Sequence, residues 1–300
     1  MEKTGKDRSL NMRRRRRKSL KIATDTIVKK DSTETSTTTT KVPTVTKTTT
    51  TIILPIDAEP ITRKLTIEVC IHCYNYQKRL SWMLSSLLQQ KGDRPNIVAN
   101  ISYTPNNGNP TTESVIKLFK ERGLVIKETI LTKEQIHNRA IARNIQIKES
   151  QADWILFADC DMVYDPLFFE DLQRQLQNDL RNETRVMGAD RLSLNIPFCI
   201  KYFEEDKREY PCEIENVSDI TAKWPVWRVC GGGTAPGNFQ LAKMSIVRAR
   251  GSKYSFRQRD RWRRTASDRH FRLVMKGRVQ IKTKPQYHLN HDRGGPELQR

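Results

Sequence analysis

The sequence contains no long apolar run and no paired-cysteine framework. Across its 300 residues, no segment approaches the ~20 consecutive apolar residues that a membrane-spanning helix needs. The six cysteines lack the regular spacing of small secreted domains, and Cys70, Cys160 and Cys230 lie within or beside apolar segments. The basic cluster Arg13–Lys18 is not followed by the apolar core of a signal peptide. We therefore expect a cytoplasmic protein with reduced thiols and without a transmembrane segment.

Acidic residues are scarce relative to basic ones. The chain has 34 Asp and Glu against 54 Lys and Arg, which gives a formal net charge of +20. Residues 1–64 carry a net charge of +9, so +11 belongs to the rest of the chain. The densest part runs from Arg248 to Arg264, where Asp260 alone is acidic. This excess favours an anionic partner, such as nucleic acid, a phosphorylated substrate or an anionic membrane surface with peripheral association. A solvated, mobile loop is the alternative for this segment.

The first sixty-odd residues have little apolar surface to bury. Arg13–Lys18 is a run of six cations, and Ser32–Thr51 consists largely of threonine. Neither stretch can offset the conformational entropy that ordering would cost. We predict that residues 1–61 form a disordered basic and Thr-rich arm and that residues 62–300 form the folded domain.

The rest of the chain alternates strand-like and helix-like segments, which is typical of an α/β fold with a doubly wound, mostly parallel sheet. Strands are expected at Leu65–Cys70, Ile97–Tyr103, Leu124–Leu131, Trp154–Asp159 and Arg185–Ala189. Helices are expected at Gln77–Gln90, Thr111–Arg122, Pro166–Leu180 and, after a capping box of Thr132 and Gln135, up to about Ser150. The pattern becomes less regular after Ala189. In such a sheet, ligands bind beyond the carboxyl ends of the strands.

The apolar strand Trp154–Asp159 ends at two carboxylates one residue apart, Asp159 and Asp161. Because side chains alternate along a strand, we expect both carboxylates to point the same way. Two converging anionic oxygen donors suit a hard divalent cation. An Asp turn that leads into the next helix is the alternative interpretation.

The helix before this strand carries three polar residues of interest. Asn144 lies on the apolar stripe of the helix, where an unpaired amide is costly, so it must bond either to a neighbouring strand end or to a ligand. Arg139 and Arg143 are four residues apart on one face, a suitable pair for an anion, although exposed helical arginines are commonly solvated.

Two further candidates lie in the last part of the chain. Ser267 is predicted to cap a helix, which places Asp268 in the first turn, where the helix dipole favours an ionised carboxylate. Such a carboxylate can accept a proton from a hydroxyl group; a carboxylate that only complements the dipole is the alternative. His288 and His291 offer two imidazoles, and a metal held by only two carboxylates requires another ligand.

Together these residues resemble the family 2 glycosyltransferases of the GT-A fold. The resemblance extends roughly from Leu65 to His291. The segments that carry it are Cys73-Tyr74-Asn75, Ala142-Arg143-Asn144, Leu156–Asp161, Asp165-Pro166, Gly237-Asn238, Asp268 and Tyr287-His288-Leu289. The family often has Thr-Tyr-Asn at the first of these and usually an Asp after the second strand, where this chain has Thr104–Gly108.

The resemblance implies a Rossmann-like sheet with an acceptor-side C-terminal half. It also implies an inverting transfer of a sugar from a nucleotide-diphosphate donor to a hydroxyl group of a carbohydrate or lipid-linked acceptor. Mn²⁺ or Mg²⁺ would be held by Asp159, Asp161 and His288, and Asp268 would be the catalytic base. The implied donor-binding residues are Cys73, Asn75, Asn106, Arg143, Asn144 and Asp159, and the implied acceptor-side residues are Gly237 and Asn238.

Two other functions are compatible with parts of the sequence. A sugar nucleotidyltransferase would need a glycine- and Arg/Lys-rich phosphate loop after the first strand, where this chain has His72–Tyr76. A nucleic-acid-binding protein would use Arg248–Arg264, in which Trp262 lies between cations. Binding of a nucleotide that depends on Mn²⁺ favours the transferase, whereas salt-sensitive binding of nucleic acid without metal favours the binding protein.

Overall fold

The computed structural model describes residues 63–178, 185–230, 238–251 and 266–291. Within these residues, nine strands form one sheet in the order β3-β2-β1-β4-β8-β6-β9-β5, with β7 paired to β6. The strands are β1 (Thr66–His72), β2 (Asn96–Tyr103), β3 (Ile126–Ile130), β4 (Trp154–Asp159), β5 (Met162–Tyr164), β6 (Val186–Leu194), β7 (Val226–Cys230), β8 (Phe239–Lys243) and β9 (Arg278–His288). The predicted α/β class is confirmed, but the sheet is mixed: β1 to β4 pair in parallel, as predicted, whereas β8, β7 and β5 pair antiparallel with their neighbours.

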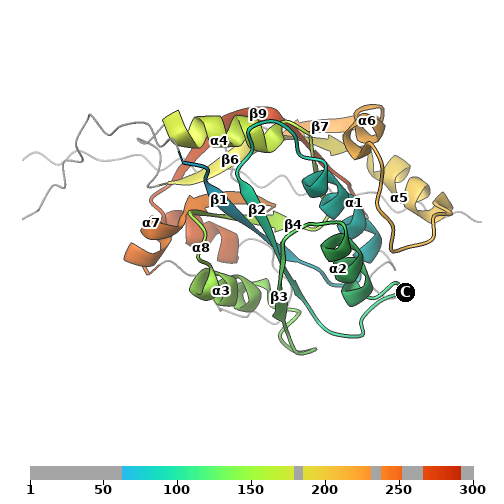
Figure 1. The fold of residues 1–300 in the computed structure, drawn as a ribbon, viewed down its shortest axis with the longest axis horizontal. Helices are drawn as coiled ribbons and strands as arrows, with labels where there is room; N and C mark the ends of the chain where they lie inside the picture. The colour runs from blue at the N-terminus through green and yellow to red at the C-terminus, as the bar shows by residue number, and fades with distance from the viewer. Residues whose placement is uncertain (1–62, 179–184, 231–237, 252–265, 292–300) are drawn as a thin grey trace, which may run out of the picture. The chain divides into compact units, whose positions relative to one another are not determined.

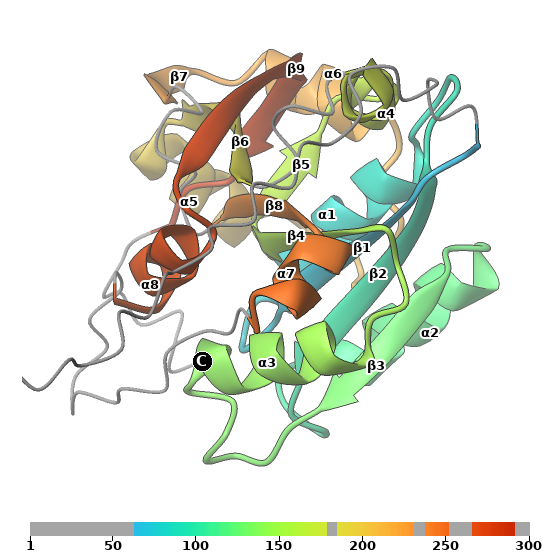
Figure 2. The ribbon, with the colours of Figure 1, turned by 90° about the vertical axis from the view of Figure 1, so that its left-hand side faces the viewer.

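Helices cover both faces of this sheet (Figure 1). They are α1 (Gln77–Leu88), α2 (Thr112–Glu121), α3 (Arg139–Glu149), α4 (Phe168–Asn178), α5 (Ile196–Glu205), α6 (Val217–Ala222), α7 (Met244–Ala249) and α8 (Ala266–Val274). The main core cluster packs α1, α2 and α4 on one face, and a second cluster packs α3, α7 and α8 on the other. Figure 2 shows α3, α7 and α8 gathered on their side of the sheet.

The central strands are apolar on both faces because helices cover both. Strand β4 is buried from Trp154 to Ala158, and β1 is buried at all five inner positions. Cys70 belongs to the cluster on the α3 side and Cys73 to the main core, so the two thiols lie on opposite faces. Every described cysteine is a free thiol, as expected.

The second helix forms as its end signals predict. The Thr111 hydroxyl accepts a hydrogen bond from the Ser114 backbone N–H at 3.2 Å, which caps the start of α2. Gly123 follows its last turn with φ +89°, a left-handed conformation that favours glycine. Local chemistry was therefore sufficient to predict this element.

The prediction of one helix from Thr132 to about Ser150 was wrong at its start. The capping box forms, because Thr132 N donates to Gln135 Oε1 at 3.1 Å and Gln135 N donates to Thr132 Oγ1 at 3.3 Å. Residues 133–137 nevertheless make only turns. Asn138 is extended (φ −116°, ψ 90°), and its side chain accepts from Ala140 N, so α3 begins at Arg139. This places Arg139 in the first turn of the helix, at the carboxyl edge of the sheet.

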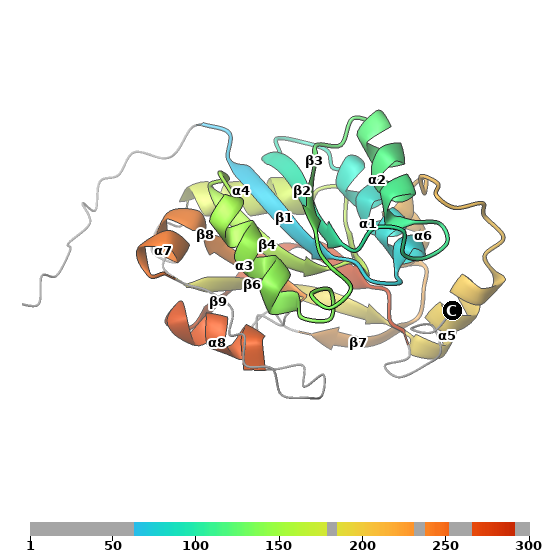
Figure 3. The same ribbon diagram turned by 90° about the horizontal axis from the view of Figure 1, so that it is seen from below.

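The C-terminal half is more regular than the sequence suggested. The strand expected at Arg185–Ala189 extends to Leu194 as β6, and the end of the helix expected at Leu180 lies outside the described residues. Strand β8 inserts antiparallel beside β4, and β9 runs parallel to β6 and antiparallel to β5. Figure 3 shows β7 beside β6, towards α5. These long-range pairings bring the last part of the chain back to the Asp-x-Asp strand.

Two predictions, on membrane-spanning helices and on the N-terminal arm, concern residues that the structure describes only in part. No helix in the described ranges is long and apolar enough to cross a membrane. The predicted arm, residues 1–61, lies outside the described residues, and residues Asp57–Arg300 cluster as one compact unit. The arm therefore stays a prediction.

Candidate active site at the carboxyl edge of the sheet

The carboxyl ends of three neighbouring strands bring polar residues into one row. His72 at the end of β1 pairs in register with Ser102 on β2 and with Asp159 on β4. The His72 Nδ1 atom lies 3.0 Å from Ser102 Oγ. Three polar side chains thus lie side by side at the carboxyl edge of the sheet.

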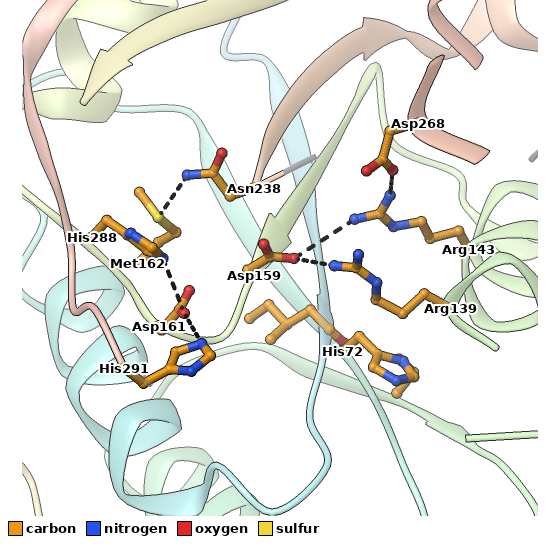
Figure 4. A network of polar contacts seen from close by, with 12 residues as sticks. His72, Arg139, Arg143, Asp159, Asp161, Met162, Asn238, Asp268, His288 and His291 are labelled. Atoms are coloured by element: carbon orange, nitrogen blue, oxygen red, sulfur yellow. Dashed lines mark hydrogen bonds and ion pairs between the residues drawn. The ribbon is translucent and has the colours of Figure 1, made fainter. Parts of the chain in front are cut away.

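Asp159 is held by two arginines of α3. Its Oδ1 atom accepts a hydrogen bond from Arg139 Nη1 at 2.8 Å and lies 3.9 Å from Arg143 Nη2 (Figure 4). The Asp159 side chain is 31% exposed and that of Arg139 is 25% exposed, so both groups are within reach of a ligand. The two arginines act as the pair that the helical spacing predicted.

Arg143 also contacts the acidic residue at the start of α8. Its Nη1 atom donates to Asp268 Oδ1 at 2.5 Å, and its guanidinium lies 5.3 Å from the centre of the Phe157 ring. The Arg143 side chain is only 3% exposed, so it is not a solvated surface cation. Asn144, which the sequence placed on the buried stripe, is half-buried, and Arg143 and Gln146 are the buried polar residues of α3. Helix α3 thus directs the buried Arg143 side chain towards the sheet. The spacing of apolar residues along the helix did not predict this.

The side chain of Asp161 contacts two histidines, whereas that of Asp159 contacts arginines. Its Oδ2 atom lies 3.2 Å from His288 Nε2 and 3.3 Å from His291 Nε2. Tyr76 Oη lies 3.3 Å from the other ring nitrogen of His291. Burial acts to raise the pKa of Asp161, but the two imidazoles outweigh it and hold the pKa well below its usual range. Asp159 and Asp161 therefore have separate partners, as Figure 4 shows.

The residues around Asp161 are suited to a cation. Asp161 Oδ1 is buried and has no hydrogen-bond partner among the described residues, and the same is true of His288 Nδ1. A buried carboxylate oxygen without a donor favours a positive charge beside it. As the side chains stand, no group of three or more His, Cys, Asp or Glu in the described ranges is arranged as a metal shell. The donor set fits a divalent ion, but the ligand assignment Asp159, Asp161 and His288 stays a prediction.

Sequence reasoning missed two histidines near the carboxylates, His72 and His291. It predicted His288 as a metal ligand but not His291, although the two imidazoles lie equally close to Asp161. Burial and then the nearby Arg139 and Arg143 charges lower the pKa of His72 to about 3, so its imidazole is neutral. The only signal for His72 was its place at a strand end, and for His291 its spacing of three from His288.

The expected donor-binding residues have different environments. Cys73 is buried in the main core with 1% exposure. Asn75 has a left-handed backbone (φ 59°) and is half-buried. Asn106 is exposed, also left-handed (φ 55°), and its backbone N–H donates to Glu113 Oε1 at 2.7 Å. Arg143 lies 3.9 Å from Asp159 and pairs with Asp268.

The acceptor-side residues are only partly described. Gly237 lies outside the described residues, whereas Asn238 is buried and donates from Nδ2 to Met162 Sδ at 3.0 Å. Helix α8 begins at Ala266, so Ser267 lies inside the helix and the prediction that it is the cap was wrong. Asp268 is nevertheless in the first turn, as expected. Most of the Arg248–Arg264 segment also lies outside the described residues.

The strand-end residues thus gather at the carboxyl edge of a mixed α/β sheet. Residues 68–182 match the family described as glycosyl transferase family 2. This match agrees with the resemblance that the sequence motifs indicated. The matched region includes Asp159 and Asp161 but ends before Asn238, Asp268 and His288.

Two solved structures show the same fold. The TarS protein of S. aureus superposes with a TM-score of 0.50 and 13% identity, covering 75% of this chain and 36% of that chain. Its residues 1–349 in complex with UDP-GlcNAc give a TM-score of 0.50 and 14% identity, covering 78% and 61%. This chain therefore spans less than two thirds of each of these proteins. The comparison with curated proteins found no match.

Proposed function

We propose that this protein is an inverting, metal-dependent glycosyltransferase that moves a hexosyl or related sugar from a nucleotide-diphosphate donor to a hydroxyl group. The observation that carries the proposal is the continuous row Arg139–Asp159–Arg143–Asp268 at the carboxyl edge of the sheet. The row supports the proposal because its two arginines are suited to a diphosphate, and its two carboxylates are the proposed metal ligand and the proposed base. The family match and the UDP-GlcNAc complex of TarS support a donor of this kind.

On the donor side, the two arginines provide charge for a diphosphate. Arg139 and Arg143 each present a planar guanidinium, which binds phosphate oxygens in two-point contacts. Asp159, Asp161 and His288 would hold Mn²⁺ or Mg²⁺, which when bound supplies a Lewis acid that neutralises charge on the departing nucleotide. The neutral His72 adds no charge to this part of the site.

On the acceptor side, Asp268 is the proposed base. Its carboxylate would take the proton from the acceptor hydroxyl while the oxygen attacks the anomeric carbon opposite the leaving group. Attack on that face inverts the configuration of the sugar. The acceptor, carbohydrate or lipid-linked, carries the new glycosidic bond.

A nucleotide-sugar screen tests the function. We expect one of a panel of UDP- and GDP-sugars to release nucleotide with Mn²⁺ and not with EDTA. The double variant Arg139→Gln and Asp159→Asn should lose this activity, whereas Lys201→Gln on the exposed face of α5 should keep it. If no donor is bound or hydrolysed while the protein binds RNA or DNA without metal, the basic chain is a nucleic-acid-binding protein instead.

A further inference from the structure

Arg143 physically connects the donor half of the proposed site with the base. Its two terminal nitrogens face carboxylates from different elements, Asp159 of β4 at 3.9 Å and Asp268 of α8 at 2.5 Å. Arg139, one turn earlier on α3, contacts Asp159. Figure 4 shows Arg143 between the two carboxylates and Arg139 beside Asp159 alone. A change at Asp159 can therefore reach α8 through Arg143.

Asp268 is not free to act as a base in this arrangement. Its side chain is only 9% exposed, and Oδ1 accepts the hydrogen bond from the guanidinium. An acceptor hydroxyl must come within hydrogen-bond distance of a carboxylate oxygen before it can transfer its proton. The 9% exposure leaves little access for an acceptor hydroxyl, and separation of Asp268 from Arg143 would free Oδ1 and open the carboxylate to it.

A diphosphate is the ligand that can separate the pair. Breaking a buried ion pair is costly because each charge is left without a partner in a poorly solvated place. That cost falls when the guanidinium gains another anion, and arginine binds phosphate oxygens in two-point contacts. The row holds two cations and two carboxylates, so an added diphosphate creates competition for the same guanidinium groups.

We infer that Arg143 is a positioning residue that holds Asp268 in place until the donor diphosphate takes over its guanidinium. Donor binding then releases Asp268 towards the acceptor, and the base is engaged only when a donor is present. The inference rests on the proposed function.

Hydrogen exchange of α8 tests this link in the full chain. Backbone amides of residues 268–274 are compared with and without UDP and with and without GDP, each with Mn²⁺, after calorimetry has shown which nucleotide binds. In the parent protein, we expect bound nucleotide to speed exchange in α8 several-fold, because the helix loses its tie to α3. In Arg143→Gln, exchange should be fast without nucleotide and should not rise further.

Two further variants complete the test. One leaves the Arg143–Asp268 pair intact, and the other breaks this pair from α8. Lys148→Gln changes an exposed residue of the same helix that lies outside the proposed site, so the nucleotide-dependent rise in α8 exchange should persist. If Arg143→Gln does not fold, Asp268→Ala breaks the same contact from α8 and should give the same constant, fast exchange. Bound nucleotide that leaves α8 exchange unchanged or slower in the parent overturns the inference alone. Failure of both nucleotides to bind overturns the proposed function and this inference together.

Discussion

At the residue scale, the two carboxylates of the Asp-x-Asp sequence have opposite surroundings. Asp159 is partly exposed beside arginines, and Asp161 is buried beside histidines. Asp159 shares Oδ1 with the two arginines, whereas Asp161 keeps one oxygen without a donor among the described residues and is the better placed of the two proposed ligands for a cation. The two residues therefore make different contributions to the same site.

Replacing Asp159 by Asn should weaken Mn²⁺-dependent nucleotide binding. The change removes the charge of a proposed metal ligand, and we expect a loss of about 10-fold or more, since even outer-shell partners matter on that scale at metal sites. Stability should change little because the side chain is 31% exposed. Calorimetric titration with UDP or GDP measures the binding.

Asp153→Asn at the opposite end of the same strand, where Asp153 pairs with Arg63, is the control. If Asp159→Asn and Asp161→Asn both turn over donor at the parent rate, the metal assignment is wrong.

Replacing Asp268 by Asn should separate catalysis from donor binding. The amide is nearly isosteric but cannot accept the proton, so transfer should fall by about 10²-fold or more, the usual scale of acid-base catalysis. Nucleotide affinity should not fall, because the proposed metal ligands are on other elements and loss of the carboxylate leaves the Arg143 guanidinium free for the diphosphate. Rates of transfer and calorimetric affinities are measured on the same preparation.

An Asp268→Asn protein that transfers sugar at the parent rate would show that the base lies elsewhere. Glu204 and Glu205, which are exposed on α5, would then be the next candidates. Asp260 would be another, although it lies outside the described residues. A loss of nucleotide affinity in the same variant would instead give Asp268 a role in the metal site or in the fold.

At the element scale, α3 is attached to the sheet by polar contacts. Gln146 is 1% exposed and donates from Nε2 to the Asn100 carbonyl oxygen at 3.0 Å. Asn100 in turn donates to Glu68 Oε1 at 2.8 Å, and Lys127 Nζ lies 3.1 Å from Glu68 Oε2. This buried network fixes the helix that carries Arg139 and Arg143, because a polar contact specifies one position of the helix more narrowly than an apolar one.

Gln146→Met tests this attachment. The substitution keeps the volume but removes the Gln146 hydrogen bond to the Asn100 carbonyl oxygen, while the Thr129 hydroxyl still donates to Asn100 Oδ1, so we expect a loss of about 1 kcal/mol of unfolding free energy. Nucleotide affinity should fall as well, because the helix is less firmly placed. Urea denaturation followed by circular dichroism measures the first effect. Lys148→Met on the exposed side of the same helix should stay within about 0.5 kcal/mol of the parent. Equal stability of both variants would contradict the role of the network.

At the scale of the whole molecule, the charge and the catalytic fold are separable properties. The net charge of +20 is shared between the first 64 residues and the remainder, whereas the proposed site lies entirely between His72 and His291. Charge of this kind promotes association with anionic surfaces but does not decide the fold. The two properties should therefore respond to different changes.

Deleting residues 1–60 should leave donor hydrolysis unchanged. The predicted arm has little apolar surface to bury and contributes none of the proposed site residues. Hydrolysis rates of the full-length and truncated proteins are compared at equal concentration. A truncated protein that is insoluble or inactive would show that these residues pack on the domain.

The N-terminal half of the fold followed from local chemistry. Apolar strands, helix ends such as Thr111 and Gly123, and the strand-end position of Asp159 are determined by neighbouring residues, and the structure contains them as expected. The start of α3 was missed because two overlapping cap signals compete, and Asn138, not Thr132, begins the helix. The sequence therefore predicted which segments form helices and strands in this half. It did not predict the start of α3, because two capping residues compete there.

The sequence by itself determined the class of sheet, the Asp-x-Asp strand and the arginine pair, because these depend on periodicity and spacing within a few residues. Only the tertiary structure decided that Arg143 is buried against Asp268 and that His291 reaches Asp161. Those contacts join residues 125 or more positions apart through β8 and β9, strands whose pairing no local pattern specifies. The packing of distant elements determines the partner of a buried charged group, because a buried charge without a partner is energetically costly.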